Sequence, residues 1–206
     1  MNKQIKAVIF DWGGVMIDDP GPGLMRYCAD KLKVTTEQFT NTFLKFLEGF
    51  QKSCVSEEKF WELMCRDLNA EKPAEVSLWK QAFKTVYRPR KEMFTLAETL
   101  KKSGYKTALL SNTELPAMDF FLEQKYNCFD FKVISCIEGY TKPKKEIYEI
   151  IIKRLDCKPE QVVFIDDKKE MIDGAAQAGL NAILFESTCQ IRKKLSQFGL
   201  DCISRM

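Results

Sequence analysis

Near its N-terminus the chain reads IKAVIFDWGGV over residues 5–15. A short apolar run with β-branched residues is typical of a buried strand in a parallel sheet. Asp11 ends this run, and Gly13 and Gly14 follow at once. Glycines in this place allow a sharp turn and a close approach of the backbone to a ligand. The stretch predicts a carboxylate at a strand end, acting as a nucleophile, a metal ligand or simply a turn residue.

Beyond residue 90 the sequence alternates between predicted strands and predicted helices. Apolar runs indicate strands at 105–110, 129–134, 162–165 and 181–185. Helical spacing of apolar residues indicates helices around 93–100, 118–122, 143–155 and 171–178, and an amphipathic helix at the end of the chain. This alternation predicts an α/β fold, a doubly wound parallel sheet with helices on both faces.

The segment between the first strand and this alternation predicts helices only. Residues 18–23 are dense in Gly and Pro and indicate a linker. Farther on, Thr35 and Gln38 fit a capping box, Ser56 fits a helix N-cap, and Pro73 suits a first helical turn. The aromatic residues recur at helical spacing, which favours the core of a small bundle over a cofactor site.

Composition excludes several classes of function. The chain of 206 residues contains no histidine, so it cannot hold a Ser-His or Cys-His couple or a zinc site with a His ligand. Acids and bases are mixed along the chain at a net charge of +3, which gives no reason to expect nucleic acid or a membrane surface as partner. Acid–base chemistry therefore falls mainly to carboxylates.

The eight cysteines form no CxxC pair, and the N-terminus shows no signal-peptide pattern. No apolar run approaches the length of a membrane-spanning helix. We therefore expect reduced thiols packed as small apolar side chains and a cytoplasmic location.

Several polar residues fall at or near predicted strand ends. They are Asp11, Ser111, Lys142, Asp166 and Asp167. Ligands of open α/β sheets bind beyond the carboxyl ends of the strands, so one edge is expected to gather all of these side chains. Three carboxylates in one crevice require a cation, and Mg²⁺ is the usual ion near phosphate. A lysine and a hydroxyl beside them suit phosphoryl transfer.

Each of these residues also has an ordinary structural interpretation. Ser111 can cap a helix, the Asp166–Asp167 pair can cap the next one, and Lys142 can be a solvated surface lysine. Their joint placement at strand ends favours the functional interpretation.

The chain resembles the haloacid dehalogenase (HAD) superfamily over essentially its whole length. The four family motifs appear in order as Asp11-Trp12-Gly13-Gly14-Val15, Leu110-Ser111-Asn112-Thr113, Lys142-Pro143 followed by Tyr148, and Ile165-Asp166-Asp167. The resemblance implies a HAD-like core formed by residues 1–17 and 91–206, with a helical cap formed by residues 18–90 and inserted after motif one.

The resemblance also implies roles for the motif residues. Asp11 is expected to be the nucleophile, phosphorylated transiently, with Lys142 and Ser111 as the other catalytic residues. Substrate binding is expected from Ser111, Asn112, Lys142 and Gly14. Mg²⁺ is expected to be held by Asp11, Asp167 and the Gly13 carbonyl, with Asp166 beside them.

Two positions depart from the family pattern. Family phosphatases usually carry a second Asp two residues after the nucleophile, where this chain has Gly13. The residue that would protonate the leaving group is therefore missing from its usual place. An Asn that often follows the Asp pair is replaced by Met171, with Asp173 nearby.

The resemblance implies a Mg²⁺-dependent phosphatase of a small phosphorylated metabolite, as a monomer or homodimer. One alternative is a 2-haloacid dehalogenase, whose branch also lacks the second Asp of motif one. That branch dispenses with the metal and lacks the adjacent Asp pair, so Asp166–Asp167 favours the phosphatase. A second alternative is a catalytically weak protein that uses the fold for binding, which Gly13 leaves open.

Overall fold

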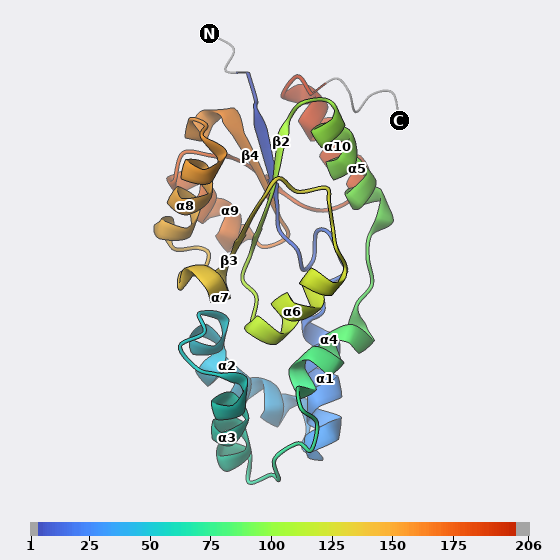
Figure 1. Cartoon of the computed structure of the whole chain (residues 1–206), viewed down its shortest axis with the longest axis vertical. Coiled ribbons are helices and arrows are strands. Elements are labelled where there is room, and N and C mark those ends of the chain that lie inside the picture. The colour runs from blue at the N-terminus through green and yellow to red at the C-terminus, as the bar shows by residue number, and fades with distance from the viewer. Residues whose placement is uncertain (1–3, 201–206) are drawn as a thin grey trace.

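The computed structural model describes residues 4–200 and contains a parallel five-stranded sheet in the order β3-β2-β1-β4-β5 (Figure 1). Its strands are β1 (Ala7–Phe10), β2 (Lys106–Ser111), β3 (Phe131–Ile134), β4 (Val162–Asp166) and β5 (Asn181–Leu184). Each neighbouring pair is parallel, so all five carboxyl ends lie along one edge. β1 is central, and β2 and β4 flank it, as the doubly wound interpretation requires.

Helices cover both faces of this sheet. One face packs against α8 (Lys145–Leu155) and α9 (Lys169–Gln177), and the other against α5 (Lys91–Lys102) and α10 (Thr188–Gln197) (Figure 1). Shorter elements complete this part, namely α6 (Leu115–Glu123), α7 (Ser135–Glu138) and the 3₁₀ turn η1 (Pro159–Gln161). The predicted α/β class and the two covered faces are confirmed.

The central strand shows why its sequence is apolar at every position. Ala7 and Ile9 belong to the cluster under α8 and α9, whereas Val8 and Phe10 face the opposite cluster. All four side chains are fully buried, because successive residues of a strand point to opposite faces and both faces are covered.

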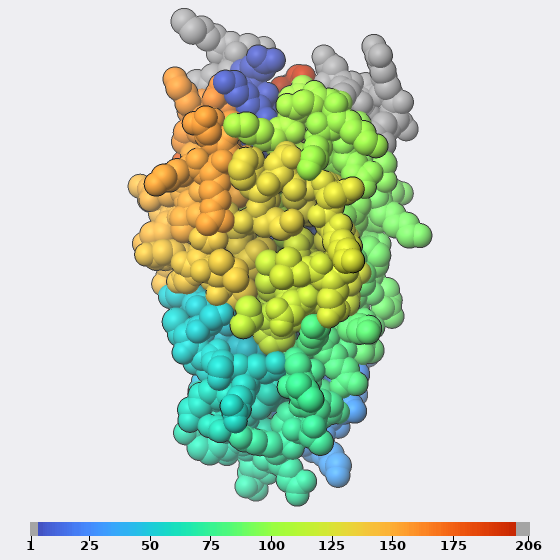
Figure 2. Space-filling model, viewed as in Figure 1, coloured from blue at the N-terminus to red at the C-terminus, as the bar shows by residue number. Residues whose placement is uncertain are grey.

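The segment between β1 and α5 folds into helices at one end of the molecule. They are α1 (Gly21–Leu32), α2 (Thr36–Gln51), α3 (Glu57–Leu68) and α4 (Leu78–Val86). Phe43, Phe60 and Trp79 form the centre of their aromatic core, with Phe43 stacked on Trp79 at 5.1 Å. Figure 2 shows the surfaces of the helical segment and the α/β part in direct contact on the viewed face.

Trp12 makes the two parts share one hydrophobic core. Its ring stacks on Phe83 of α4 at 4.8 Å and meets the edge of Phe121 of α6 at 5.0 Å. Backbone hydrogen bonds also pair the two crossings between the parts, from Asp18 N to Arg88 O at 2.9 Å and from Arg90 N to Met16 O at 2.9 Å. The helical segment is therefore held at its ends as well as by its packing.

Several local predictions are confirmed. Thr35 and Gln38 form the capping box of α2, and the Ser56 hydroxyl caps α3 by accepting from Lys59 N at 3.2 Å. All cysteines among residues 4–200 are free thiols, while Cys202 lies outside the described residues. Four of them are buried as expected, but the expected apolar packing is wrong for Cys54 and Cys189, which are exposed. Within the same range no helix is long and apolar enough to cross a membrane.

The predicted helix start at Pro73 is wrong, because α4 begins at Leu78. The Ser77 hydroxyl accepts from Lys80 N at 3.2 Å, and the carboxylate of Glu57 accepts from Trp79 N at 3.0 Å. A tertiary contact with α3 thus completes the N-terminal turn. Val76 lies outside the helix and is fully exposed.

The predicted linker at 18–23 is shorter than expected, because α1 already begins at Gly21. Pro22 stands in the first turn, where its missing N–H costs nothing, and Asp19 Oδ1 accepts from Gly21 N at 3.0 Å. The helix expected from Pro143 begins instead at Lys145, and α7 had no separate sequence signal. Leu122, which was expected on the buried stripe of α6, is about half exposed.

We expect Gly174→Ala to destabilise the fold by about 1–3 kcal/mol, because a Cβ there would lie 2.7 Å from the backbone oxygen of Pro143. α9 would have to move away from the loop that carries Lys142. Denaturant unfolding measures the change, with Gln177→Ala on the exposed side of α9 as the control. An unchanged unfolding midpoint for Gly174→Ala would show that this close approach is not required.

Candidate active site

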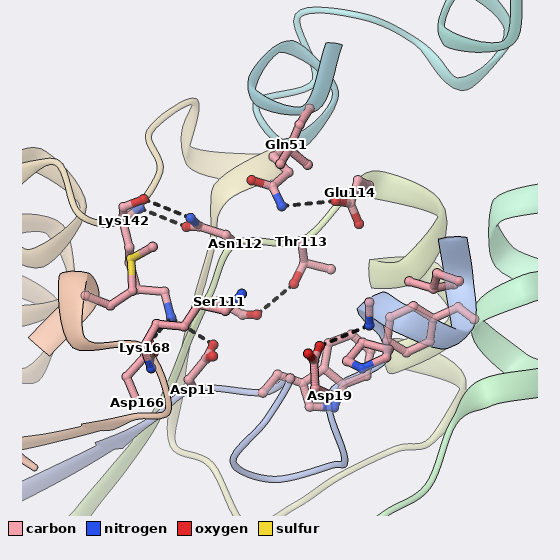
Figure 3. A pocket seen from close by; sticks show the side chains of 18 of the residues that line it. Asp11, Asp19, Gln51, Ser111, Asn112, Thr113, Glu114, Lys142, Asp166 and Lys168 are labelled. Atoms are coloured by element: carbon pink, nitrogen blue, oxygen red, sulfur yellow. Dashed lines mark hydrogen bonds and ion pairs between the residues drawn. The ribbon is translucent and has the colours of Figure 1, made fainter. Parts of the chain in front are cut away.

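The carboxyl edge of the sheet gathers the predicted residues as expected (Figure 3). Asp11 follows the central β1, Ser111 is the last residue of β2, and Asp166 is the last residue of β4. Asp11 N donates to Ile165 O at 2.9 Å, which continues the β1–β4 ladder and directs the start of the turn. The three side chains therefore stand side by side because their strands do.

Lys142 lies between two of these carboxylates. Its Nζ is 2.8 Å from Asp11 Oδ1 and 2.6 Å from Asp166 Oδ2, and all three side chains are buried. Burial alone would lower the pKa of Lys142, but the charges and hydrogen bonds of Asp11 and Asp166 raise it above its usual value. The interpretation of Lys142 as a solvated surface lysine is wrong, since only 4% of this residue is exposed.

Burial and the charge of Lys142 act in opposite directions on the pKa of the Asp11 carboxyl. Burial raises its pKa to about 7, Lys142 opposes this rise, and the negative charge of Asp166 adds to it. Asp11 Oδ1 lies 2.8 Å from the ammonium of Lys142, and a backbone hydrogen bond from Trp12 also lowers the pKa of Asp11. A further cation beside Asp11 would lower the pKa and keep the carboxylate ionised at neutral pH.

The adjacent Asp pair divides into two environments. Asp166 Oδ1 accepts from Lys168 N at 2.9 Å and Oδ2 accepts from Lys142, so both oxygens have partners. Asp167 Oδ1 is buried with no hydrogen-bond partner among the described residues. Burial and the neighbouring Asp166 charge raise the pKa of Asp167.

This donor set fits a divalent cation. Asp11, Asp166 and Asp167 each offer an oxygen within 4.8 Å of the others. Such a hard oxygen cluster suits Mg²⁺, and the unpartnered oxygen of Asp167 is the ligand position that a cation would satisfy.

Gly14 makes room for this cluster. A Cβ on Gly14 would overlap the carboxylate of Asp167, and the residue has φ of +84°. Both facts restrict the position to glycine. Gly14 is buried, is not among the residues that line the cavity, and lies against the carboxylate of Asp167. Its expected role in substrate binding stays a prediction.

The segment after β2 supplies the neutral polar groups. The hydroxyls of Ser111 and Thr113 are 2.7 Å apart. The Asn112 amide donates to Lys142 O at 2.9 Å and accepts from Lys142 N at 2.8 Å, so it fixes the loop that carries the lysine. Ser111 and Asn112 both line the cavity, and the Asn112 amide is in addition hydrogen-bonded to the backbone of Lys142.

A cavity of about 270 Å³ opens above these residues. Its base carries Asp11, Ser111 and Lys142, and its far wall comes from the helical segment. Apolar and aromatic side chains line that wall, namely Leu24, Met25, Phe43, Leu47, Trp79 and Phe83. The aromatic residues expected only as bundle core therefore also bound the cavity.

Gly13 lines the same cavity without a side chain. A Cβ at this position would lie 3.2 Å from Pro20 Cδ, so the space beside it is already partly taken by the chain entering α1. Gly13 therefore supplies no carboxyl group to the cavity at the position where family phosphatases usually carry their second Asp.

Sequence reasoning missed Glu114, which lines the cavity beside the helical segment. This carboxyl is buried and accepts from Gln51 Nε2 and Trp79 Nε1, each at 3.1 Å. Burial raises its pKa, and hydrogen bonds including those from Gln51 and Trp79 lower it in part. In the sequence, Glu114 directly precedes Leu115 and Pro116 at a helix start, which is typical of a helix N-cap residue. Its contacts with Gln51 and Trp79 depend on the fold and have no signal in the sequence.

Comparison with known proteins agrees with this geometry. A family model described as haloacid dehalogenase-like hydrolase matches residues 5–179. Acyl-CoA dehydrogenase family member 10 of Mus musculus is 28% identical over 196 residues, covering 88% of this chain. The chain spans only 18% of the length of that relative.

Two further similarities span nearly whole proteins. Glyceraldehyde 3-phosphate phosphatase of Methanothermobacter thermautotrophicus is 28% identical over 214 residues, covering 96% of this chain and 94% of that protein. A HAD family enzyme from Bacteroides thetaiotaomicron, solved with magnesium and inorganic phosphate, has a TM-score of 0.71 at 19% identity, covering 88% of this chain and 94% of the other. The structural similarity confirms the HAD-like fold.

We expect Lys142→Met to lower the free energy of unfolding by about 3–5 kcal/mol, because it leaves two buried carboxylates facing one another. Adding Asp166→Asn should restore part of this loss. Unfolding in the presence of a chelator measures both effects. Lys144→Met is the control, since its ion pair with Glu48 is exposed and screened by solvent. Equal effects of the two lysine substitutions would contradict this prediction.

Proposed function

Because this chain belongs to the haloacid dehalogenase-like hydrolases, we propose that it is a Mg²⁺-dependent phosphatase of a small phosphorylated metabolite. The observation that carries this proposal is the carboxylate cluster of Asp11, Asp166 and Asp167, in which Oδ1 of Asp167 is buried without a described hydrogen-bond partner. Its relatives in both comparisons support it, since one is named a phosphatase and another was solved with magnesium and phosphate.

Asp11 is the proposed nucleophile. Its Oδ2 would attack the phosphorus of the ester, the bond from phosphorus to the leaving oxygen would break, and water would then hydrolyse the aspartyl phosphate. Ion pairing of Oδ1 with Lys142 supports this role, because it fixes the orientation of the carboxylate. Central placement on β1 adds a rigid support.

Lys142 and Ser111 are the proposed phosphate-binding groups. Lys142 carries a buried positive charge beside the nucleophile, where it would neutralise phosphoryl oxygens. Ser111 would donate its hydroxyl hydrogen bond to the phosphoryl group. We propose that Asn112 acts through Lys142, since its amide holds the lysine backbone on both sides.

Asp11, Asp167 and the Gly13 carbonyl are the proposed ligands of Mg²⁺. We propose a supporting role for Asp166, because its two oxygens are already occupied by Lys142 and Lys168 N. When bound, the ion would supply positive charge to the phosphoryl oxygens as the P–O bond breaks.

We further propose that residues 18–90 form a cap domain on a core of residues 1–17 and 91–206. Support comes from the cavity wall, which the helical segment provides opposite the phosphate-binding residues. A volume of about 270 Å³ suits a small metabolite. The free cysteines support a cytoplasmic setting, and a monomer or homodimer remains the prediction for the assembly.

We expect wild-type protein to hydrolyse an aryl phosphate only with Mg²⁺, and Asp11→Asn to lose activity by several orders of magnitude.

Asp167→Asn should weaken Mg²⁺ binding and activity together, with partial recovery at high Mg²⁺. Phosphate release and metal titration by calorimetry measure these effects. Chloride release from 2-chloropropionate without metal would indicate the dehalogenase instead, and no turnover of either compound would indicate a binding protein.

Gly13 leads to a prediction about leaving groups. General acid help is worth about 10²–10⁴ in rate, so its absence should make alkyl phosphates far poorer substrates than aryl phosphates. Rates across leaving groups of graded pKa test this. Gly13→Asp should help alkyl substrates most, provided the Pro20 ring moves by a few tenths of an ångström. A flat series in the wild type would show that another group, such as Asp19 in the cavity lining, supplies the proton.

A further inference from the structure

Glu114 is a buried carboxyl in the cavity lining, on the side formed by the helical segment and away from the proposed nucleophile. Figure 3 places Glu114 and Gln51 together at the cap side, with Asp11 and Asp166 on the opposite side. The side chain lines the cavity, yet only 6% of the residue is exposed. It belongs to none of the four family motifs.

The hydrogen bonds of Glu114 are those of an ionised carboxylate. Oε1 accepts from Gln51 Nε2 and Oε2 accepts from Trp79 Nε1. In a protonated carboxylic acid the hydroxyl donates a hydrogen bond and its oxygen is a poorer acceptor than the carbonyl oxygen. In an ionised carboxylate both oxygens accept equally well. Burial opposes this ionisation, and the charge of Lys168 favours it.

No cation forms an ion pair with Glu114 among residues 4–200. Neutral donors hold the carboxylate, and Lys168, which lines the same cavity, acts on it through its charge without forming an ion pair. Each oxygen accepts one side-chain hydrogen bond, and the backbone N–H of Glu114 supplies a further one. A carboxylate has about four acceptor sites, so capacity for a ligand donor remains. Burying such a charge costs desolvation free energy, which a hydrogen-bond donor or a cation of the ligand would offset.

The cavity thus has two ends of opposite character. Lys142 and the proposed metal site favour a phosphoryl group at one end, and Glu114 presents negative charge at the other. Between them Phe43, Trp79 and Phe83 offer apolar and aromatic walls. A ligand that spans the cavity must meet both ends.

We infer that Glu114 is a specificity-determining residue, which admits phosphate monoesters whose alcohol bears a hydrogen-bond donor and excludes those with a second anionic group. This inference rests on the proposed phosphatase function. A hydroxyl or ammonium of the alcohol would donate to a free lone pair of Glu114. A second carboxylate or phosphate would face like charge in a desolvated site.

Glu114 also joins the two parts of the molecule, because Gln51 and Trp79 belong to the helical segment. A purely structural role would change stability and affect all substrates alike. A specificity role changes the ratio between substrates that differ only in charge. The ratio is therefore the quantity to measure.

The test uses four phenyl phosphates that carry a para methyl, hydroxymethyl, aminomethyl or carboxymethyl group. Their similar phenol acidities keep the chemical step comparable. For the wild type, kcat/KM should be about 10²-fold or more lower for carboxymethyl than for methyl, because like charges repel in a buried site. It should be higher for hydroxymethyl and aminomethyl than for methyl.

In Glu114→Gln the carboxymethyl and methyl substrates should come within about tenfold of each other, and the advantage of aminomethyl should disappear. Glu48→Gln is the matched control, because Glu48 also bridges the two parts, through Lys144, but lies outside the cavity. Its ratios should equal those of the wild type. Unchanged ratios in Glu114→Gln, or the same change in Glu48→Gln, would overturn the inference.

Binding of the four corresponding benzylphosphonates separates this inference from the proposed function. If no ester is hydrolysed, the phosphatase proposal fails, but weaker calorimetric binding of the carboxymethyl phosphonate alone would still support the role of Glu114. Equal affinity of all four compounds for the wild type, or no binding of any, would overturn it. This arm needs no variant, so it decides the matter even if Glu114→Gln does not fold.

Discussion

The site depends on one buried ammonium, that of Lys142, between the carboxylates of Asp11 and Asp166. Two carboxylates brought together by neighbouring parallel strands would repel in a low dielectric. Lys142 offsets that repulsion and reaches the pair only because its loop is held by the Asn112 amide. The arrangement is costly in desolvation, which makes it an unusual choice for stability alone. It leaves one oxygen on Asp11 and one on Asp167 without a protein cation, and this is the state a metal-assisted hydrolase needs.

Close backbone approaches at two glycines make this arrangement possible. Gly14 leaves space for the Asp167 carboxylate, and Gly174 lets α9 lie against Pro143 next to Lys142. Arg90 adds a contact from the other crossing by donating to the Gly14 carbonyl at 2.5 Å. The geometry of the charged groups is therefore held by backbone packing on several sides, so the side chains need little reorganisation when charge develops.

The helical segment is an integral wall of the site. Trp12, directly after the proposed nucleophile, packs into its core against Phe83. The Ser135 hydroxyl accepts from Thr113 N at 2.9 Å and donates to Gln51 O at 2.7 Å, so the end of α2 is tied to the segment that follows β2. The same Gln51 donates to Glu114. Any shift of the helical segment would thus change the surroundings of both ends of the cavity.

Sequence alone determined the α/β class, the parallel sheet and the identity of the strand-end residues. The spacing of apolar residues and the positions of turn-forming residues are local properties of the chain. The spacing of strands and turns was enough to single out Asp11, Ser111, Lys142, Asp166 and Asp167, since strand ends of a parallel sheet share one edge. Tertiary structure alone decided the burial of Lys142, the start of α4 at a cap completed by Glu57, and the position of Glu114 against Gln51 and Trp79. Those contacts join residues far apart in the chain. Their energies depend on which surfaces meet, and no local pattern encodes that.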